Sequence, residues 1–446
     1  YMATVHKDSG HETVYVKGAC DYILERCTYV QKKDHTEPMT QAAKMKIRMA
    51  METMARDGLR VLALGYRERV TGHSEEELIN HLVFAGMAGM IDPPKKKVAQ
   101  SVKTLKKAGV QVVMITGDYK DTAFAVARKI GIADSIEQCM TGRELEEISD
   151  AAFARRMKNI RVFARVTPAH KVRIVQRFKA NGKIVAMTGD GVNDAPSLQT
   201  ADIGIAMGRN GTDVAKNAAD MILTDDDFST IEKAMAEGRG IYVNIKKSIL
   251  FLLSSNFGEM ITMFLAVLLG LPSPLKASHI LWVNLITDSL PALALGVDKN
   301  NTEILMKKKP REPEEGLFAH GGWVFTVFYG ILIAGLTLYA FHLGGQTYAF
   351  TVLGVSQLFH AIGMRDRDCS VFRMNHLENP LMILAFCLGL GLQIMVAEIP
   401  YFVSLFHTAR LTFGEWKLLL CISAVPLLMH ELLLIPRRIF GTRKNQ

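Results

Sequence analysis

The chain has 446 residues, of which 22% are charged and 49% hydrophobic, with a formal net charge of +9 and a mean hydropathy of +0.14. The cationic excess does not indicate nucleic-acid binding, because no basic patch is interleaved with aromatic residues and many cations flank apolar runs. Six cysteines without a CxxC pair or zinc-type spacing exclude a zinc site, and we expect them to be free thiols.

The chain has two unlike halves, with a soluble α/β composition up to about Arg239 and long apolar runs beyond it. In the first 84 residues we expect strands over 13–16 and 60–64 and a helix from Ala42 to Met54, where apolar residues recur at helical spacing. Further on, strands alternate with helices such as 95–107 and 121–130, which predicts a parallel, doubly wound sheet. These strands are expected over 84–91, 110–115, 161–164, 184–187, 203–206 and 221–223.

The run Thr188-Gly-Asp-Gly-Val-Asn-Asp-Ala-Pro-Ser197 is the most informative motif in the chain. It follows the apolar strand 183–187, and its glycines permit a sharp turn, so that Asp190, Asn193 and Asp194 can converge at the carboxyl end of that strand. Mg²⁺ prefers oxygen ligands of this kind. An ordinary turn is the alternative interpretation, because Asp, Asn and Gly are common turn residues.

This run resembles the signature of the P-type ATPases, ion pumps that form and break an aspartyl-phosphate. Its ten matched positions favour that interpretation over an ordinary turn, and other segments agree with it along essentially the whole chain. Residues 92–94 resemble the segment that leads into the phosphorylation domain, residues 114–118 resemble the second phosphate motif, and residues 163–171 supply the lysine that the family places beside the phosphate. Residues 17–19 and 58–64 resemble motifs of the nucleotide domain.

The resemblance implies ATP and Mg²⁺ as cofactors and gives each motif a role. The residues implied to contact the nucleotide or the phosphoryl oxygens are Lys17, Gly18, Arg60, Thr116, Gly117, Asp118 and Lys171. The residues implied to bind Mg²⁺ or to orient its ligands are Asp190, Asn193 and Asp194. For Lys17 and Arg60 taken alone, a surface cation at the end of a strand is the alternative interpretation.

Two family motifs are absent from this chain. The phosphorylated aspartate of the family lies in an Asp-Lys-Thr-Gly-Thr segment, to which Asp298-Lys299 comes closest, and the Thr-Gly-Glu-Ser loop does not occur either. The first four membrane helices of the family pattern are missing, and the chain starts in mid-strand at Tyr1. We therefore expect the carboxyl-terminal part of a pump, whose missing amino-terminal part is its partner and which forms no aspartyl-phosphate alone.

Apolar stretches dominate the chain after Ser248, and each is close to the roughly 20 residues that cross hydrocarbon. Basic residues concentrate in 298–320, 365–379 and the C-terminal tail, so we expect a multi-pass protein in a lipid bilayer with its soluble half and C-terminus in the cytoplasm. Short loops favour a prokaryotic cell membrane. The six expected transmembrane helices lie near 248–271, 277–297, 321–344, 347–364, 380–403 and 415–435.

Polar residues within the first two apolar stretches predict a cation site. Asn256 and Glu259 are spaced i, i+3, and Asn284, Thr287 and Asp288 also share a helical face. Charged groups are energetically costly in hydrocarbon, so an acid there indicates a function or a paired cation. No Lys or Arg lies nearby within the helices to pair with the two acids. Together these residues form an oxygen-rich cage, close to the six to eight ligands that Ca²⁺ takes. For a lone Asn or Thr, hydrogen bonding between helices is the alternative.

Both segments resemble the calcium-pump subgroup, which implies that the cage binds Ca²⁺. Gln357 is a further expected ligand and stands where two-ion calcium pumps have Glu, as in one-ion calcium pumps. One-ion pumps, however, usually lack an acid at the position of Glu259, so the number of ions per cycle, one or two, remains open. His360 is interpreted as a packing histidine, with proton carriage as the alternative. Glu398 and Glu431 are expected to reach the membrane interface.

The sequence thus predicts the carboxyl-terminal part of a P-type Ca²⁺-transporting ATPase. Its expected parts are the end of a nucleotide-binding domain (1–84), a haloacid-dehalogenase-like phosphorylation domain (85–239) and a stalk with six transmembrane helices (240–446). The alternatives are a pump for Mn²⁺ or another cation, a membrane-anchored phosphatase of the haloacid dehalogenase kind, and a passive channel. The intramembrane acids argue against an anchor, and the phosphate motifs argue against a channel.

Overall fold

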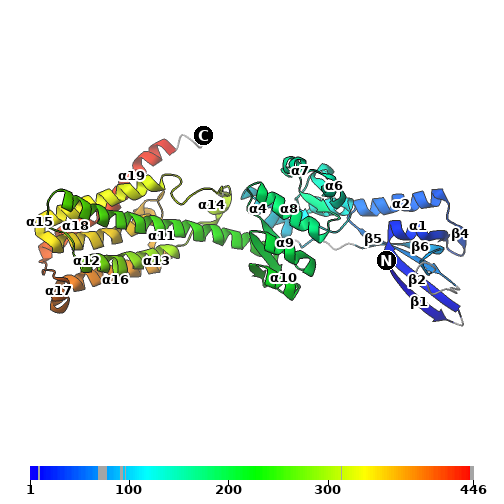
Figure 1. Ribbon diagram of the computed structural model, residues 1–446, viewed down its shortest axis with the longest axis horizontal. Coiled ribbons are helices and arrows are strands. Elements are labelled where there is room, and N and C mark those ends of the chain that lie inside the picture. Colours follow the sequence, from blue (N-terminus) through cyan, green and yellow to red (C-terminus); the bar gives the residue numbers. More distant parts are fainter. Residues whose placement is uncertain (9–10, 69–77, 91–93, 96, 313, 442–446) are drawn as a thin grey trace. The chain divides into compact units, whose positions relative to one another are not determined.

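The computed structural model describes residues 1–446 except 9–10, 69–77, 91–93, 96, 313 and 442–446. The chain divides into two compact units (Figure 1), and each is described by itself. The first unit comprises Tyr1–Lys233 and Met306–Pro313, and the second comprises Ala234–Leu305 and Glu314–Gln446. Of the segment expected to lead into the phosphorylation domain, Asp92 and Pro93 lie outside the described residues.

The first unit begins with a six-stranded sheet in the order β1-β2-β5-β6-β3-β4. The β3–β6 pair is parallel, and the other pairs are antiparallel. In β2, buried Val14 and Val16 alternate with exposed Tyr15 and Lys17, so one face of the strand is turned to the core. The strands are β1 (Met2–Asp8), β2 (His11–Ala19), β3 (Cys27–Gln31), β4 (Thr36–Pro38), β5 (Arg60–Arg67) and β6 (Leu82–Met90).

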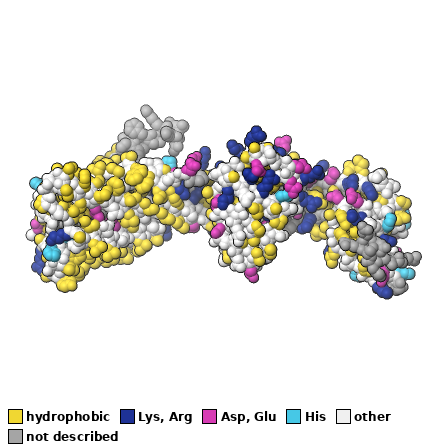
Figure 2. All heavy atoms as spheres, viewed as in Figure 1, with side chains coloured by type: hydrophobic (Ala, Val, Ile, Leu, Met, Phe, Trp, Pro, Cys, Tyr) yellow, Lys and Arg dark blue, Asp and Glu magenta, His cyan; other side chains and the backbone are white. Residues whose placement is uncertain are grey.

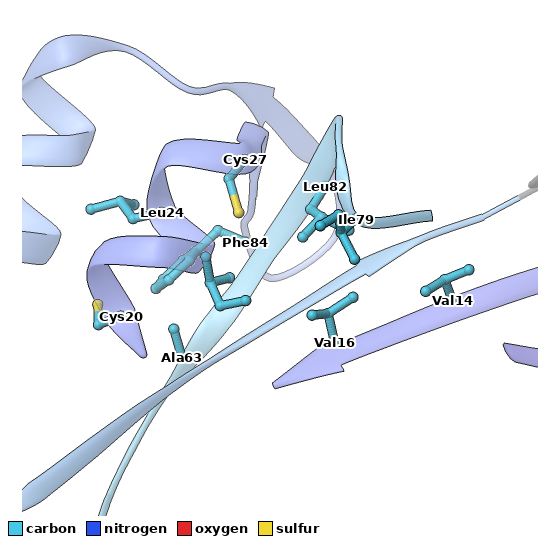
Figure 3. Close-up of a cluster of buried hydrophobic side chains, with 10 residues drawn as sticks. Val14, Val16, Cys20, Leu24, Cys27, Ala63, Ile79, Leu82 and Phe84 are labelled. Carbon is cyan, nitrogen blue, oxygen red and sulfur yellow. The ribbon is translucent and has the colours of Figure 1, made fainter. Parts of the chain in front are cut away.

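Two helices accompany this sheet. α1 (Cys20–Arg26) buries Ile23 and Leu24 in a core with apolar residues of β2, β5 and β6. Figure 3 shows Leu24 with other members of this core. α2 (Gln41–Arg56) starts where the Thr40 hydroxyl accepts a hydrogen bond from the Ala43 N–H at 3.1 Å, which satisfies one free donor of the first turn. Its partly buried Ile47 packs against the same core.

The strand expected at 84–91 belongs to this first sheet, contrary to its expected place in the phosphorylation domain. β6 pairs with β5 along residues 83–90 and with β3 on its other side. The boundary expected between residues 84 and 85 therefore falls inside β6. Hydrogen bonds to two neighbouring strands fix this assignment, and sequence periodicity alone does not reveal strand partners.

The rest of the first unit contains two three-stranded parallel sheets, with orders β7-β9-β8 and β10-β11-β12. Parallel strands were predicted and are confirmed, but they form two sheets rather than one. Among the described residues, β7 and β10 each pair on one side only. Ile115, at the end of β7, packs against the core cluster that contains Met187 of β10. The strands are β7 (Met114–Ile115), β8 (Cys139–Thr141), β9 (Val162–Ala164), β10 (Ala186–Gly189), β11 (Ile203–Met207) and β12 (Met221–Leu223).

Helices cover both faces of the β7-β9-β8 sheet, as a doubly wound fold requires. Val162 and Ala164 of β9 pack with α4 and α5, while Phe163 between them packs on the other face with α6, α7 and α8. The helices are α4 (Val98–Lys107), α5 (Lys120–Lys129), α6 (Gly142–Glu147), α7 (Asp150–Arg156), α8 (Pro168–Ala180), α9 (Ala195–Thr200) and α10 (Asp213–Ala218).

The second unit is helical, and hydrophobic side chains dominate its visible surface in Figure 2. Four described helical stretches are long and apolar enough to cross a membrane, namely Phe228–Leu268, Gly322–Met364, Pro380–Glu398 and Phe413–Ile435. The helical segments are α11 (Phe228–Leu268), α12 (Ala277–Trp282), a π-helical segment (Val283–Asp288), α13 (Ser289–Gly296), α14 (Thr302–Lys307), α15 (Gly322–Met364), α16 (Pro380–Glu398), α17 (Pro400–Phe406), α18 (Phe413–Ser423) and α19 (Val425–Gly441).

The count of four differs from the six separate helices that the sequence predicts, for two reasons. The stretch 277–297 is divided by the π-helical segment, and α15 contains two predicted stretches joined at Gly344 and Gly345, whose backbone is not helical. The rings of Tyr329 and His360 are 4.3 Å apart, although 31 positions (360 − 329) of straight helix would separate them by about 46 Å. α15 therefore consists of two arms that fold back on each other.

Candidate functional site

The carboxyl end of β7 carries Thr116, Gly117 and Asp118 in a closed turn. The Thr116 hydroxyl donates to Asp118 Oδ2 at 2.9 Å, and the Asp118 N–H donates to Thr116 Oγ1 at 3.1 Å. The Asp118 carbonyl accepts a hydrogen bond from the Arg165 N–H at 3.0 Å, which joins this turn to the end of β9. The motif thus sits at the strand ends where ligands of such sheets bind.

Lys171 and Asp194 form an ion pair that joins two of the predicted phosphate motifs. Lys171 lies in the first part of α8, which begins at the capping residue Thr167, and Asp194 follows the turn after β10. The Asp194 side chain is 10% exposed and accepts a further hydrogen bond from the Gly191 N–H at 3.3 Å. A Cβ at Gly189 would lie 2.5 Å from the Asp194 Cβ, so this turn requires glycine there.

Asp190 and Asn193 are exposed, unlike the buried Asp194. The backbone of Asp190 is fixed, because its carbonyl accepts a hydrogen bond from the Thr212 N–H at 2.8 Å. An accessible carboxylate suits Mg²⁺, which keeps several waters and takes one or two carboxylates beside substrate phosphates. The described residues contain no group of three or more His, Cys, Asp or Glu that could hold a metal ion, so a fully protein-built metal centre is not found in them.

A pocket of about 420 Å³ in the first unit brings together Lys17, Gly18, Arg60, Gly117 and Asp118. These five come from β2, β5 and the turn after β7, which lie far apart in the sequence. Thr116 and Lys171, also predicted to contact phosphate, are not among the residues that line it. The pocket joins the predicted nucleotide motifs to one of the predicted phosphate motifs.

Sequence reasoning gave no role to two other residues of this pocket, Tyr119 and Arg165. The Arg165 guanidinium stacks 3.8 Å from the Tyr119 ring centre, and the Tyr119 hydroxyl donates to Asp21 Oδ2 at 3.4 Å. Burial raises the pKa of Tyr119, so this hydroxyl keeps its proton. Arg165 also has a left-handed backbone (φ 54°), which is uncommon for a side chain of this size and occurs at functional sites.

A second hollow of about 510 Å³ is lined by residues of α4 and of the end of α5, among them several cations, and by no residue of the motifs. The Lys106 ammonium donates to the carbonyls of Gly131 and Ile132 at 2.6 and 3.2 Å. Lys106 of α4 thus binds carbonyls just beyond the C-terminal end of α5, where a cation interacts favourably with the helix dipole.

Glu259 is the centre of the predicted cation site in the second unit. It is 5% exposed; Asn284 Nδ2 donates to its Oε2 at 3.1 Å, and Gln357 Nε2 contacts its Oε1 at 3.4 Å. The Thr287 hydroxyl contacts Gln357 Oε1 at 3.3 Å. Residues of α11, the π-helical segment and α15 thus form one hydrogen-bonded cluster.

Asp288 completes this site as its second carboxylate. It is 1% exposed, and neither carboxylate oxygen accepts a hydrogen bond within normal distance among the described residues. The fully buried Ser255 hydroxyl is its polar neighbour. Asp288 ends the π-helical segment, and Pro291 follows without an N–H, so the helix offers free carbonyls here.

Asn256 is not part of the cluster, contrary to prediction. It is exposed, whereas Ser255 and Glu259 are buried. Residues spaced by three lie about 60° apart around a helix and those spaced by four about 40°, so Ser255 faces the cluster more directly. Its i, i+4 spacing to Glu259 is the sequence signal that could have identified it.

The other polar residues that the sequence analysis noted have structural partners. His360 contacts the Ser254 hydroxyl at 2.9 Å and stacks on Tyr329, which supports its interpretation as a packing residue. Glu398 accepts a hydrogen bond from Trp416 Nε1 at 2.8 Å. Glu431 accepts one from the Val371 N–H at 2.6 Å, so both glutamates fasten neighbouring segments within the protein.

Three protein-family models match this chain. They are described as "P-type ATPase, cytoplasmic domain N" over residues 1–97, "haloacid dehalogenase-like hydrolase" over 170–235, and "Cation transporting ATPase, C-terminus" over 272–435. The first match extends past residue 90 and includes all of β6, in agreement with the sheet pairing. The chain therefore belongs to the P-type ATPases, in their cation-transporting branch.

Curated relatives refine this assignment. "Calcium-transporting ATPase 1" of Bacillus cereus (strain ATCC 10987 / NRS 248) is 46% identical over 98% of this chain and 52% of that protein. "Calcium-transporting ATPase" of Bacillus subtilis (strain 168) is 40% identical over 95% of this chain and 49% of that protein. "Calcium-transporting ATPase 1" of Saccharomyces cerevisiae (strain ATCC 204508 / S288c) is 38% identical over 97% of this chain and 47% of that protein. The chain spans about half the length of these relatives.

Proposed function

We propose that this chain is the carboxyl-terminal half of a pump that uses ATP to transport Ca²⁺ across a membrane through an aspartyl-phosphate. The observation that carries the proposal is the pair of buried acids in the second unit. Glu259 and Asp288 are 5% and 1% exposed, and within the described residues no cation pairs with either. Two acids with amides and a hydroxyl suit a hard divalent cation as cargo.

The membrane side of the mechanism depends on how the amides are arranged. Asn284 and Gln357 point donor groups at Glu259, and the Thr287 hydroxyl contacts Gln357. Rotation of the amide groups turns carbonyl oxygens toward a cation and releases the glutamate oxygens as ligands. Asp288 needs no such release from an amide, because among the described residues Ser255 is its polar neighbour and no hydrogen bond of normal distance reaches its oxygens.

The phosphoryl side rests on Lys171, Thr116 and Asp190. Lys171 would neutralise phosphoryl oxygens and Thr116 would donate to them, while Asp194 holds the lysine in position through their ion pair. Asp190, assisted by Asn193, would hold Mg²⁺, which when bound neutralises phosphate charge. Lys17, Gly18 and Arg60 would bind ATP in the pocket that they share with Gly117 and Asp118. The phosphorylated aspartate would come from the half of the pump outside this chain.

The membrane topology and the domain boundaries belong to the same proposal. We infer that the α/β part and the C-terminus are cytoplasmic, because the basic residues of 298–320 and 365–379 then lie inside. The nucleotide-binding part extends at least to Met90, because β6 belongs to its sheet. The phosphorylation part extends to about Arg239 and the membrane part from there on, close to the division of the two units between Lys233 and Ala234. A prokaryotic cell membrane is our preferred location, although the relatives include a yeast protein.

ATP-dependent uptake of ⁴⁵Ca²⁺ by vesicles that contain the full-length protein tests this function. Uptake that requires ATP and Mg²⁺ and stops with an ionophore supports it. Uptake of ⁵⁴Mn²⁺ in preference to ⁴⁵Ca²⁺ would show that the transported ion is Mn²⁺ and would leave the proposed mechanism unchanged. Phosphate release from small phosphomonoesters without any ion uptake would favour the membrane-anchored phosphatase instead.

A further inference from the structure

Gln393 of α16 is a buried polar residue that nothing above explains. Its side chain is 0% exposed, and neither its Oε1 nor its Nε2 has a hydrogen-bond partner among the described residues. Buried amides are nearly always hydrogen-bonded, so such an exception calls for a specific explanation. Because Gln393 is 0% exposed, a partner from outside the described residues would have to be as small as a water or an ion.

Gly354 of α15 places Gln393 next to the cation site. A Cβ at Gly354 would lie 3.2 Å from Gln393 Oε1 and 3.5 Å from Thr287 Cγ2. Thr287 in turn contacts Gln357, which lies on the same face of α15 as Gly354 at i, i+3. Gln393 Oε1 and the Thr287 methyl group therefore both pack closely against the position of Gly354, and the absence of a side chain there lets Gln393 approach Thr287.

A second buried polar group lies on this face of α15. Thr351 precedes Gly354 at the same three-residue spacing, is 1% exposed, and its hydroxyl has no hydrogen-bond partner among the described residues. Thr351, Gly354 and Gln357 thus lie on one face of α15, with a buried polar side chain on either side of the glycine. The polar lining extends beyond Glu259 and Asp288 toward α16.

We propose that the amide oxygen of Gln393 is a further ligand of the transported cation, bound directly or through one water on the Thr287 side of the site. The proposal rests on the function proposed above and deepens it. A neutral oxygen adds to the coordination number without adding charge to the two acids. Ca²⁺ takes six to eight oxygens in flexible geometry, whereas Mg²⁺ requires a compact octahedron and gives up water reluctantly. Gln393 therefore favours Ca²⁺ over Mg²⁺.

Gln393→Leu tests this role, because leucine fills much of the same volume and carries no oxygen. Equilibrium binding of ⁴⁵Ca²⁺ to the purified full-length protein, without ATP, should show a Ca²⁺ dissociation constant about tenfold higher or more. Mg²⁺ should also compete better in the variant. Gly354→Ala should weaken Ca²⁺ binding as well, because its Cβ would lie only 3.2 Å from Gln393 Oε1 and would displace the amide. If Gln393→Leu fails to fold, the Ca²⁺ affinity of Gly354→Ala tests the ligand role instead.

Ser423→Ala is the matched control. Ser423 of α18 is also 0% exposed with an unpartnered hydroxyl, but α18 contributes no residue to the cluster around Glu259. Native Ca²⁺ affinity in this variant with weakened affinity in Gln393→Leu supports a ligand role. Equal effects in both variants, or native affinity in Gln393→Leu and Gly354→Ala, would overturn it.

Uptake measurements separate this inference from the proposed function. If the wild-type protein transports ⁴⁵Ca²⁺ and Gln393→Leu binds it with native affinity, the ligand role fails and the function stands. If the wild type binds ⁴⁵Ca²⁺ with a Gln393-dependent affinity but transports none, the ligand role stands and the function fails. A wild type that neither binds nor transports Ca²⁺ refutes both.

Discussion

Asp298 provides the sharpest test of how the second unit is held together. Its side chain is 3% exposed, and it pairs with Lys247 at 3.2 Å and with Arg365 at 3.1 Å. Asn379 Nδ2 donates to the same carboxylate at 2.9 Å. Asn244 Nδ2 donates to the Asp298 carbonyl at 2.7 Å, so this residue links α11, α15 and the start of α16.

Asp298→Asn should destabilise the protein strongly, because it leaves two cations beside each other. The side chains of Lys247 and Arg365 are 14% and 6% exposed, so water cannot fully replace the lost carboxylate. A gross attraction of about 5 kcal/mol per pair follows for unit charges 3.1–3.2 Å apart at an effective dielectric constant of about 20. Part of it is offset by desolvation, and removing one partner of a buried pair costs about 3–5 kcal/mol net.

Thermal unfolding of the detergent-solubilised protein, followed by size-exclusion chromatography, measures this cost. A loss of about 3 kcal/mol lowers the midpoint by about 6–12 °C for a domain of roughly 200 residues. Asp366→Asn, a change at an exposed carboxylate nearby in sequence, is the control and should shift the midpoint by less than about 2 °C. Equal midpoints for Asp298→Asn and the wild type would refute the reasoning that these cations depend on Asp298.

Three further predictions concern the proposed sites and the buried thiols. In the full-length protein, Asp190→Asn should reduce phosphorylation by [γ-³²P]ATP about a hundredfold while ⁴⁵Ca²⁺ binding stays native, and native phosphorylation would remove Asp190 from the metal site. Asp288→Asn should raise the Ca²⁺ concentration for half-maximal phosphorylation from ATP by at least about tenfold, while phosphorylation from inorganic phosphate should persist and resist Ca²⁺; unchanged Ca²⁺ dependence would contradict the cation site. Burial raises the pKa of Cys20 to about 11 and that of Cys27 to about 12, so both should resist iodoacetamide at pH 8 until the protein unfolds. Because only the thiols of the unfolded protein ionise from about pH 8.5, the stability of the folded protein should fall as the pH rises from there toward 11. Rapid alkylation of either thiol in the folded protein, seen by mass spectrometry, would count against this burial.

Local patterns were enough to predict much of this protein. Period-two and period-3.6 hydrophobicity located β2, β5, α2 and most elements of the phosphorylation part to within a few residues, because these periods follow directly from strand and helix geometry. The contiguous motif after β10 placed Asp190 and Asp194 at the end of that strand, because a short glycine turn allows few arrangements. The long apolar runs predicted membrane helices, because hydrocarbon accepts few other sequences.

What the sequence could not decide depends on contacts between segments distant in the chain. Residues three apart on a helix still point about 60° apart, so spacing alone could not decide whether Asn256 or Ser255 lies beside Glu259 in the cluster. The packed structure decides it, because Ser255 is buried and Asn256 is exposed. Asp298 matched part of a phosphorylation motif in the sequence, whereas in the structure it is the buried partner of two cations. Hydrogen-bonding partners assigned β6 to the first sheet, and the close packing of Gln393 and Thr287 against Gly354 connected Gln393 to the cation site. Burial and partnership are properties of the packed chain, because the same residue pattern is compatible with several neighbours until the tertiary structure selects one.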